Sequence, residues 1–242
     1  MNEPVRIAMW SGPRNLSTAM MYSFAQHSDC EVIDEPFYPA YLHDTGLDHP
    51  YAKEIIANGP ISAEAVCEAL STGIVNSPVQ YQKHITKHLL ADYPRDWLAL
   101  VCNIFLIRHP ARVICSYHIK DEDPEISDIG ILDQWQIYQR VIELGQTPIV
   151  VDSYDILRNP ERELRRICAF AGIVFQTSML SWPAGPKSYD GIWAPHWYHS
   201  VWQSEGFAQP PGELPQVPEH LNALLQESMP YYERLKALTV TD

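Results

Sequence analysis

The first 35 residues contain the feature that most limits the fold of this chain. A short apolar segment, residues 5–10, leads directly into the turn-forming residues 11–15. Residues 16–27 are then expected to form a helix, and residues 30–34 a second strand that ends before Pro36. Two strands joined by a helix in so short a segment predict a right-handed parallel crossover. The chain is therefore expected to be an α/β protein.

The remaining periodic segments extend this pattern into a three-layer α/β fold, with a mostly parallel central sheet flanked by helices. Strands are expected at residues 79–85, 99–107 and 148–152, and helices at residues 62–72, 111–119, 131–144, 160–171 and 218–238. Two aromatic-rich segments, 37–60 and 176–217, show no clear period, and such loops usually carry function. We expect one domain over residues 1–242, with these two segments as substrate or lid segments.

The charge balance limits the partners of the chain. Its formal net charge is −13, whereas a general nucleic-acid binder needs a basic face. The longest apolar run, residues 97–107, is far shorter than the roughly 20 residues that span a bilayer. The N-terminus has no basic segment followed by an apolar one, so we expect no secretory signal and a cytoplasmic location. No sequence feature specifies an oligomeric state.

The turn between the first strand and helix is a candidate anion site. A loop that enters a helix N-terminus offers free backbone N–H groups and the positive end of the helix dipole. Arg14 adds a guanidinium group, and Ser17 and Thr18 add hydroxyl donors. The loop is not a Walker A motif, because Leu16 stands where the second glycine is sought. An ordinary helix start capped by serine or threonine is the alternative interpretation.

A second candidate follows the apolar strand that ends at Ile107. Arg108 leaves the sheet at its carboxyl edge, and Ser116 lies two helical turns further along the chain. Both side chains can point to the same edge as the first loop. In open α/β sheets this edge is where ligands bind.

With these motifs the chain resembles the sulfotransferase superfamily, P-loop-like enzymes that use 3′-phosphoadenosine-5′-phosphosulfate (PAPS). Residues 13–18 match the family's Pro-Lys-Ser-Gly-Thr-Thr loop, with Arg14 for lysine and Leu16 for glycine. Residues 108–117 fit the family's Arg-x-Pro-x-x-x-x-x-Ser-Tyr pattern at every fixed position. Residues 153–164 resemble its Tyr-Glu-Asp-x-x-x-Asn-Pro segment, although Ser153 stands in place of the tyrosine. The resemblance implies a P-loop NTPase-like sulfotransferase fold.

The resemblance also implies a set of cofactor-binding residues. The 5′-phosphosulfate of PAPS would lie on Arg14, Asn15, Leu16, Ser17 and Thr18, and the 3′-phosphate on Arg108 and Ser116. Lys187 stands in the region where the family has a loop that closes over the 3′-phosphate. Arg14 would stabilise the bridging oxygen during transfer. The reaction would leave 3′-phosphoadenosine-5′-phosphate (PAP), and the family chemistry requires no metal.

A general base must take the proton of the acceptor hydroxyl. Glu35 is the first candidate, because it lies at the carboxyl end of the second strand in a Glu-Pro turn like that of bacterial sulfotransferases of the trehalose type. In the segment around Lys83, this lysine could assist transfer and His84 or His88 could act as the base instead. The two histidines are also spaced as zinc ligands, but no third ligand follows at a typical spacing.

The leading hypothesis is a PAPS-dependent sulfotransferase that acts on a hydroxyl of a small, neutral acceptor. The acidic chain disfavours a polyanionic acceptor, and stacking on the aromatic residues would suit a sugar or a ring alcohol. The alternatives are a P-loop kinase that uses Mg-ATP and a catalytically silent nucleotide-binding protein.

Overall fold

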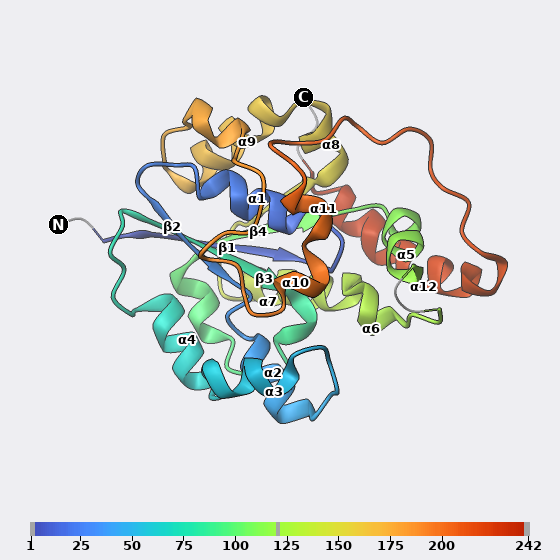
Figure 1. The fold of residues 1–242 in the computed structure, drawn as a ribbon, viewed down its shortest axis with the longest axis horizontal. Helices are drawn as coiled ribbons and strands as arrows, with labels where there is room; N and C mark the ends of the chain where they lie inside the picture. Colours follow the sequence, from blue (N-terminus) through green and yellow to red (C-terminus); the bar gives the residue numbers. More distant parts are fainter. Residues whose placement is uncertain (1–2, 120–121, 240–242) are drawn as a thin grey trace.

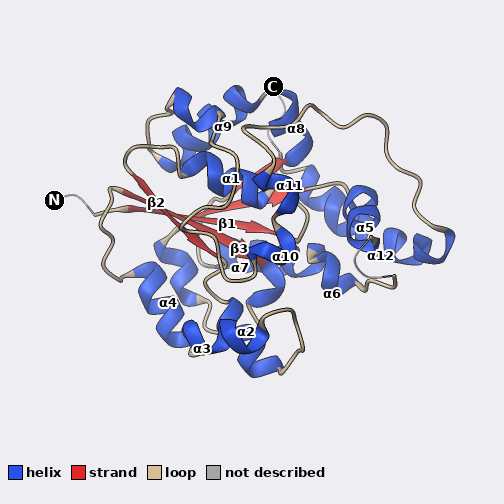
Figure 2. Ribbon diagram, in the orientation of Figure 1, coloured by secondary structure: helices blue, strands red, loops and turns tan. Residues whose placement is uncertain are grey.

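The central sheet has five strands, all parallel, in the order β2-β3-β1-β4-β5. The structure is a computed structural model that describes residues 3–119 and 122–239. The strands are β1 (Val5–Ser11), β2 (Cys30–Asp34), β3 (Val79–Ile85), β4 (Cys102–Ile107) and β5 (Ile149–Asp152). Because all five strands are parallel, their carboxyl ends meet at one edge of the sheet. The predicted α/β fold with a mostly parallel sheet is confirmed (Figure 2).

Helices cover both faces of this sheet (Figures 1 and 2). Alternate residues of β1 divide the core, because Ile7 and Met9 belong to one buried cluster while Ala8 and Trp10 belong to the other. The first cluster includes side chains from α1 (Ser17–Phe24), α8 (Ser153–Arg158) and α9 (Pro160–Ala171). The second includes α4 (Ala63–Ser71), α5 (Pro110–His118), α7 (Ile131–Glu143) and α12 (Asn222–Lys236). A short helix, α6 (Ile126–Ile129), precedes α7.

The strand expected at residues 99–107 is shorter than its apolar run suggested. The strand β4 begins at Cys102, and residues 96–100 form a 3₁₀ turn in which Trp97 and Leu98 are buried. The side-chain amide of Asn103 donates to the carbonyls of Leu98 and Val101, at 2.7 and 3.1 Å. Burial alone made this turn look like strand, because an apolar run does not distinguish the two conformations.

The expectation of an aperiodic loop at residues 37–60 is wrong in part. This segment forms two helices, α2 (Tyr38–Thr45) and α3 (Ala52–Asn58). Helix α2 has Pro39 in its first turn and ends at Gly46, whose φ of 66° lies in the left-handed region. Helices of seven or eight residues contain about two turns. So short a pattern cannot establish a period.

The segment 176–217 is mostly irregular, as expected, and folds back over the sheet edge. It contains the 3₁₀ turn Thr177–Leu180 and two single-turn helices, α10 (Ala194–Trp197) and α11 (His199–Trp202). A bridge between Ser181 and Gly206 closes its base. The following residues run as a long strand-free connection to the 3₁₀ turn Glu219–Leu221 and α12 (Figure 1). Within residues 3–119 and 122–239, no helix is long and apolar enough to cross a membrane.

Candidate active site

The turn between β1 and α1 has an unusual backbone. Arg14 and Leu16 have φ values of 63° and 75°, in the left-handed region that non-glycine residues rarely adopt. Leu16 is the N-cap residue of α1, and its apolar side chain cannot accept the free N–H groups of the first turn. Gly12 is held so close to the carbonyl of Ile129 that an added Cβ would lie 2.3 Å from that oxygen. Strain of this kind gathers at functional sites.

The two candidate phosphate-binding motifs are in direct contact. Arg14 Nε donates to Ser116 Oγ at 3.0 Å, and one terminal nitrogen of Arg108 donates to the carbonyl of Arg14 at 2.6 Å. Burial lowers the pKa of both guanidinium groups. The positive charges of Arg112 and Arg14 lower the pKa of Arg108 further, while Asp152 acts in the opposite sense. Positive charge therefore converges at this edge of the sheet, as expected of an anion site.

A cavity of about 820 Å³ opens at the carboxyl edge of the strands. This volume is within the range of small-molecule sites. Ten of the predicted site residues line it: Arg14, Asn15, Leu16, Ser17, Thr18, Glu35, Lys83, His88, Arg108 and Ser116. Both segments that the sequence marked as aperiodic contribute to its wall, among others through Tyr38, His49, His196, Trp197 and Tyr198. The predicted residues therefore surround one cavity.

Two other predicted residues lie elsewhere. The ammonium of Lys187 donates to the carbonyls of Ala184 and Gly185 in its own loop, and it lies 5.1 Å from the centre of the Tyr22 ring. It does not line this cavity. His84 points to the opposite face of β3, where its ring stacks on Trp10 with centroids 4.2 Å apart. The structure thus does not bring Lys187 to Arg108 or His84 to the cavity.

Burial decides the state of the two candidate histidines. It lowers the pKa of His84 to about 3, so this imidazole is neutral at physiological pH. His88 does line the cavity, and its ring stacks on Tyr38 with centroids 4.3 Å apart. Burial lowers the pKa of His88 well below its ordinary value, and the nearby Lys87 adds to the effect. Its Nδ1 lies 3.7 Å from Glu35 Oε2.

Glu35 is held at the end of β2 by its own backbone. Its N–H donates to the carbonyl of Lys83 at 3.0 Å, and its carbonyl accepts from the N–H of Tyr38 at 3.0 Å. The φ of Glu35 is 42°, which turns the chain sharply after the strand. Its side chain is largely buried, and Oε1 accepts from the Lys83 ammonium at 2.5 Å.

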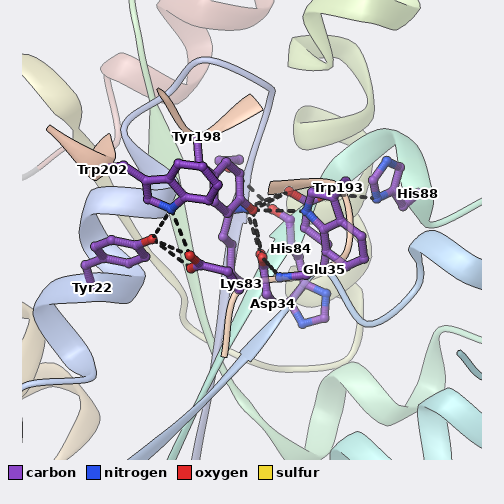
Figure 3. Close-up of polar contacts among 12 residues, drawn as sticks. Tyr22, Asp34, Glu35, Lys83, His84, His88, Trp193, Tyr198 and Trp202 are labelled. Carbon is purple, nitrogen blue, oxygen red and sulfur yellow. Dashed lines mark hydrogen bonds and ion pairs between the residues drawn. The ribbon is translucent and has the colours of Figure 1, made fainter. Parts of the chain in front are cut away.

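Glu35 belongs to a buried polar cluster that we define as Asp34, Glu35, Lys83 and Tyr198 (Figure 3). Lys83 Nζ lies 2.8 Å from Asp34 Oδ1 and also donates to the hydroxyl of Tyr198. The Tyr198 hydroxyl lies 2.8 Å from Asp34 Oδ2, and it accepts from the indole nitrogen of Trp193 at 3.1 Å. The cluster therefore joins β2 and β3 to the segment 176–217, which we call the C-terminal segment.

Opposing effects set the protonation of this cluster. Burial raises the pKa of Glu35, Lys83 lowers it, and the charge of Asp34 raises it again. Burial alone would lower the pKa of Lys83, but the carboxylates of Asp34 and Glu35 raise it above its ordinary value. The site thus holds a charged lysine beside a carboxylate with a raised pKa. A raised pKa makes a carboxylate a stronger proton acceptor than an ordinary one.

Sequence reasoning missed Asp34 and Tyr198. Asp34 had a visible signal, because two acidic residues follow each other where β2 ends. Tyr198 had none, since it is 115 residues from Lys83 in a segment without a period. In the described parts of the chain, no group of three or more histidine, cysteine, aspartate or glutamate side chains could hold a metal ion.

A family model described as a sulfotransferase domain matches residues 5–239. This chain belongs to the sulfotransferase family. The resemblance drawn from the three sequence motifs is confirmed, and the match includes every element that builds the cavity.

Solved structures of sulfotransferases share the fold of this family member. The sulfotransferase from Alicyclobacillus acidocaldarius aligns over 100% of this chain and 98% of its own, with a TM-score of 0.60 and 13% identity. The sulfotransferase domain from the curacin biosynthetic pathway aligns over 98% of this chain and 99% of its own, with a TM-score of 0.53 and 15% identity.

Two curated proteins of Arabidopsis thaliana are more similar in sequence. Branched-chain-amino-acid aminotransferase-like protein 1 is 38% identical over 237 residues, which is 98% of this chain and 42% of the relative. Branched-chain-amino-acid aminotransferase-like protein 2 is 36% identical over 230 residues, which is 95% of this chain and 41% of the relative. The chain therefore spans about two fifths of the length of these curated relatives.

Proposed function

We propose that this chain transfers the sulfuryl group of PAPS to a hydroxyl of a small, neutral acceptor. One observation carries the proposal: Arg14, Arg108 and Ser116 meet at the open N-terminus of α1 and line the same cavity as Glu35. A candidate phosphate site and a candidate base are thus combined in a chain of the sulfotransferase family. The expectation of a cytoplasmic location stays a prediction.

The residues present fit a nucleotide with two phosphorylated positions. The loop 13–18 would hold the 5′-phosphosulfate through its backbone N–H groups and Arg14, and Arg108 with Ser116 would hold the 3′-phosphate. An anion between these groups would compensate the mutual repulsion of Arg14 and Arg108 that lowers the pKa of Arg108. PAPS supplies the activated sulfuryl group. The positive charge of Arg14 would stabilise the negative charge that develops on the leaving phosphate.

Glu35 is proposed as the general base. Its Oε1 is bound to Lys83, while Oε2 is the carboxylate oxygen on the side of His88. The acceptor hydroxyl would give its proton to Oε2 as its oxygen bonds to sulfur. Lys83 is predicted to assist catalysis, and we propose that its positive charge stabilises the Glu35 carboxylate. His88 remains the alternative base, but its lowered pKa makes it a weaker proton acceptor than an ordinary imidazole.

The names of the plant relatives mention an aminotransferase, and we do not propose this activity for the chain. The chain spans only about two fifths of their length, and the family model that covers it is a sulfotransferase domain. Two measurements distinguish the remaining hypotheses from a sulfotransferase. The nucleotide that binds identifies a kinase, and turnover identifies a silent nucleotide-binding protein.

Calorimetric titration with PAP, with ADP and with Mg-ATP tests the proposal. We expect PAP to bind and both other nucleotides to bind much more weakly. In Arg108→Ala, the loss of charge-assisted hydrogen bonds should weaken PAP binding by about 10- to 100-fold. Arg140→Ala is the matched control, because Arg140 pairs with Asp96 and Glu143 on the surface.

Each outcome has a distinct meaning. Preference for Mg-ATP would replace the sulfotransferase with the kinase, and unchanged PAP affinity in Arg108→Ala would refute the assigned phosphate site. If PAP binds, transfer of labelled sulfate from PAPS is measured over a panel of sugars and ring alcohols. PAP binding without transfer to any acceptor would favour the silent nucleotide-binding protein.

A further inference from the structure

The three hydrogens of the Lys83 ammonium are all used within the buried cluster. They point to Asp34 Oδ1, to Glu35 Oε1 and to the hydroxyl of Tyr198. Lys83 is 1% exposed, so water cannot replace any of these acceptors without rearrangement. An ammonium with three fixed acceptors has no hydrogen left to offer a substrate.

The hydroxyl of Tyr198 is used just as fully. It accepts from Lys83 and from the indole of Trp193, so its single hydrogen is left to donate. This hydrogen is shared among three acceptors within reach: Asp34 Oδ2 at 2.8 Å, Asp34 Oδ1 at 2.9 Å and Glu35 Oε1 at 3.3 Å. Asp34 Oδ2 also accepts from the N–H of Gly191 at 3.0 Å. The segment 176–217 thus supplies both the side chain of Tyr198 and the backbone N–H of Gly191 to the cluster.

We propose that Asp34 and Tyr198 are positioning residues that fix the Lys83 ammonium on Glu35 Oε1 and thereby present Oε2 to the acceptor hydroxyl. This inference rests on the proposed role of Glu35 as the base. In the transfer step the acceptor O–H bond breaks, its proton goes to Oε2, and its electron pair forms the new bond to sulfur. The bond from sulfur to the 5′-phosphate breaks, and its electron pair stays on that phosphate.

The two positioning residues act on Glu35 with opposite signs. The groups that face the Glu35 carboxyl are Lys83 on β3, Asp34 on β2, Tyr198 of the C-terminal segment, His88 after β3 and Tyr38 on α2. The hydrogen bond from Tyr198 lowers the pKa of Glu35, whereas the charge of Asp34 raises it. Loss of the hydroxyl should therefore raise this pKa, and loss of the Asp34 charge should lower it.

A merely structural role predicts a different result. Burial is the largest cause of the raised pKa of Glu35. If a substitution only loosened the packing and admitted water, the pKa of Glu35 would fall whichever residue was changed. The sign of the shift in Tyr198→Phe therefore separates positioning from loosening.

The experiment is a pH titration followed by ¹³C NMR of protein labelled at the glutamate carboxyl carbon. The Glu35 signal is assigned by its loss in Glu35→Gln. We expect the titration midpoint of Glu35 to move to higher pH in Tyr198→Phe and to lower pH in Asp34→Asn. Tyr22→Phe is the matched control, since its hydroxyl binds Asp190 in the same C-terminal segment and not the cluster. There the midpoint should not change.

A fall or no change in Tyr198→Phe would overturn the proposal. If that variant does not fold, an unchanged or higher midpoint in Asp34→Asn would overturn it instead. The affinity for PAP is measured on the same samples and should stay within twofold, because neither residue belongs to the phosphate site. Failure of the wild-type protein to bind PAP would count against the proposed function. The direction of the NMR shifts would still decide whether Asp34 and Tyr198 fix the cluster.

Discussion

Replacing Lys83 by methionine tests the electrostatic reasoning most directly. The substitution keeps the length and apolar stem of the side chain but removes the only cation hydrogen-bonded to Asp34 and Glu35 within the described chain. The side chains of Lys83, Asp34 and Glu35 are 1%, 2% and 9% exposed. Removing one partner of a buried ion pair costs about 3–5 kcal/mol, because the other charge is left in a medium of low polarity. We expect a loss of this size at pH 8.

The loss should depend on pH with a defined sign. Lys83 lowers the pKa of Glu35, so its removal raises that pKa further above the unfolded value. A carboxyl group with a raised folded pKa contributes stability at low pH that is lost as the pH rises through that pKa. The destabilisation of Lys83→Met should therefore be larger at pH 8 than at pH 5.

Urea denaturation followed by tryptophan fluorescence measures both quantities. The control is Arg140→Met, because Arg140 pairs with Asp96 and Glu143 at side chains that are 35%, 88% and 65% exposed. Exposed pairs of this kind contribute less than about 1 kcal/mol. A loss in Lys83→Met no larger than in this control, or one that is the same at pH 5 and pH 8, would refute the reasoning.

Three further predictions follow from single side chains. Glu35→Gln should abolish the rise of turnover with pH, while the affinity for PAP stays within twofold. If the variant keeps normal turnover and its pH dependence, His88 would be assigned as the base. When the pH falls from 7 to 5, wild type should lose about 2 kcal/mol more free energy of unfolding than His84→Phe. The reason is that His84 takes up a proton in the unfolded chain but not when it is buried. Equal losses in urea denaturation would contradict this. Tyr22→Phe should lower stability by about 1–2 kcal/mol through the lost hydrogen bond to Asp190, and an unchanged melting temperature would show that this contact is not stabilising.

Much of the fold could be predicted from the sequence, because its signals are local. The apolar run of β1 and the turn residues after it predicted the first crossover, and the predicted boundaries of β2 and β3 agree with the structure. Residues 99–101 were assigned to the following strand in error, because an apolar run does not distinguish a buried turn from a strand. The helices of residues 37–60 were missed because two turns show no period.

The sequence by itself identified the candidate phosphate-binding motifs and the position of Glu35 at the end of β2. Each of these motifs begins at the carboxyl end of a parallel strand and runs into the following turn or helix, so the topology brings them to one edge. Lys83 and His84 are neighbours in β3 and point to opposite faces of the sheet, but the sequence could not show which of the two meets the cavity.

Only the tertiary structure decided the partners of Glu35. Tyr198 reaches the cluster from an irregular segment, and the direction of its hydroxyl depends on the packing of Trp193 and the return of the chain at Ser181 and Gly206. Hydrogen bonds between residues more than a hundred positions apart leave no local pattern, because their energy appears only after the elements have packed.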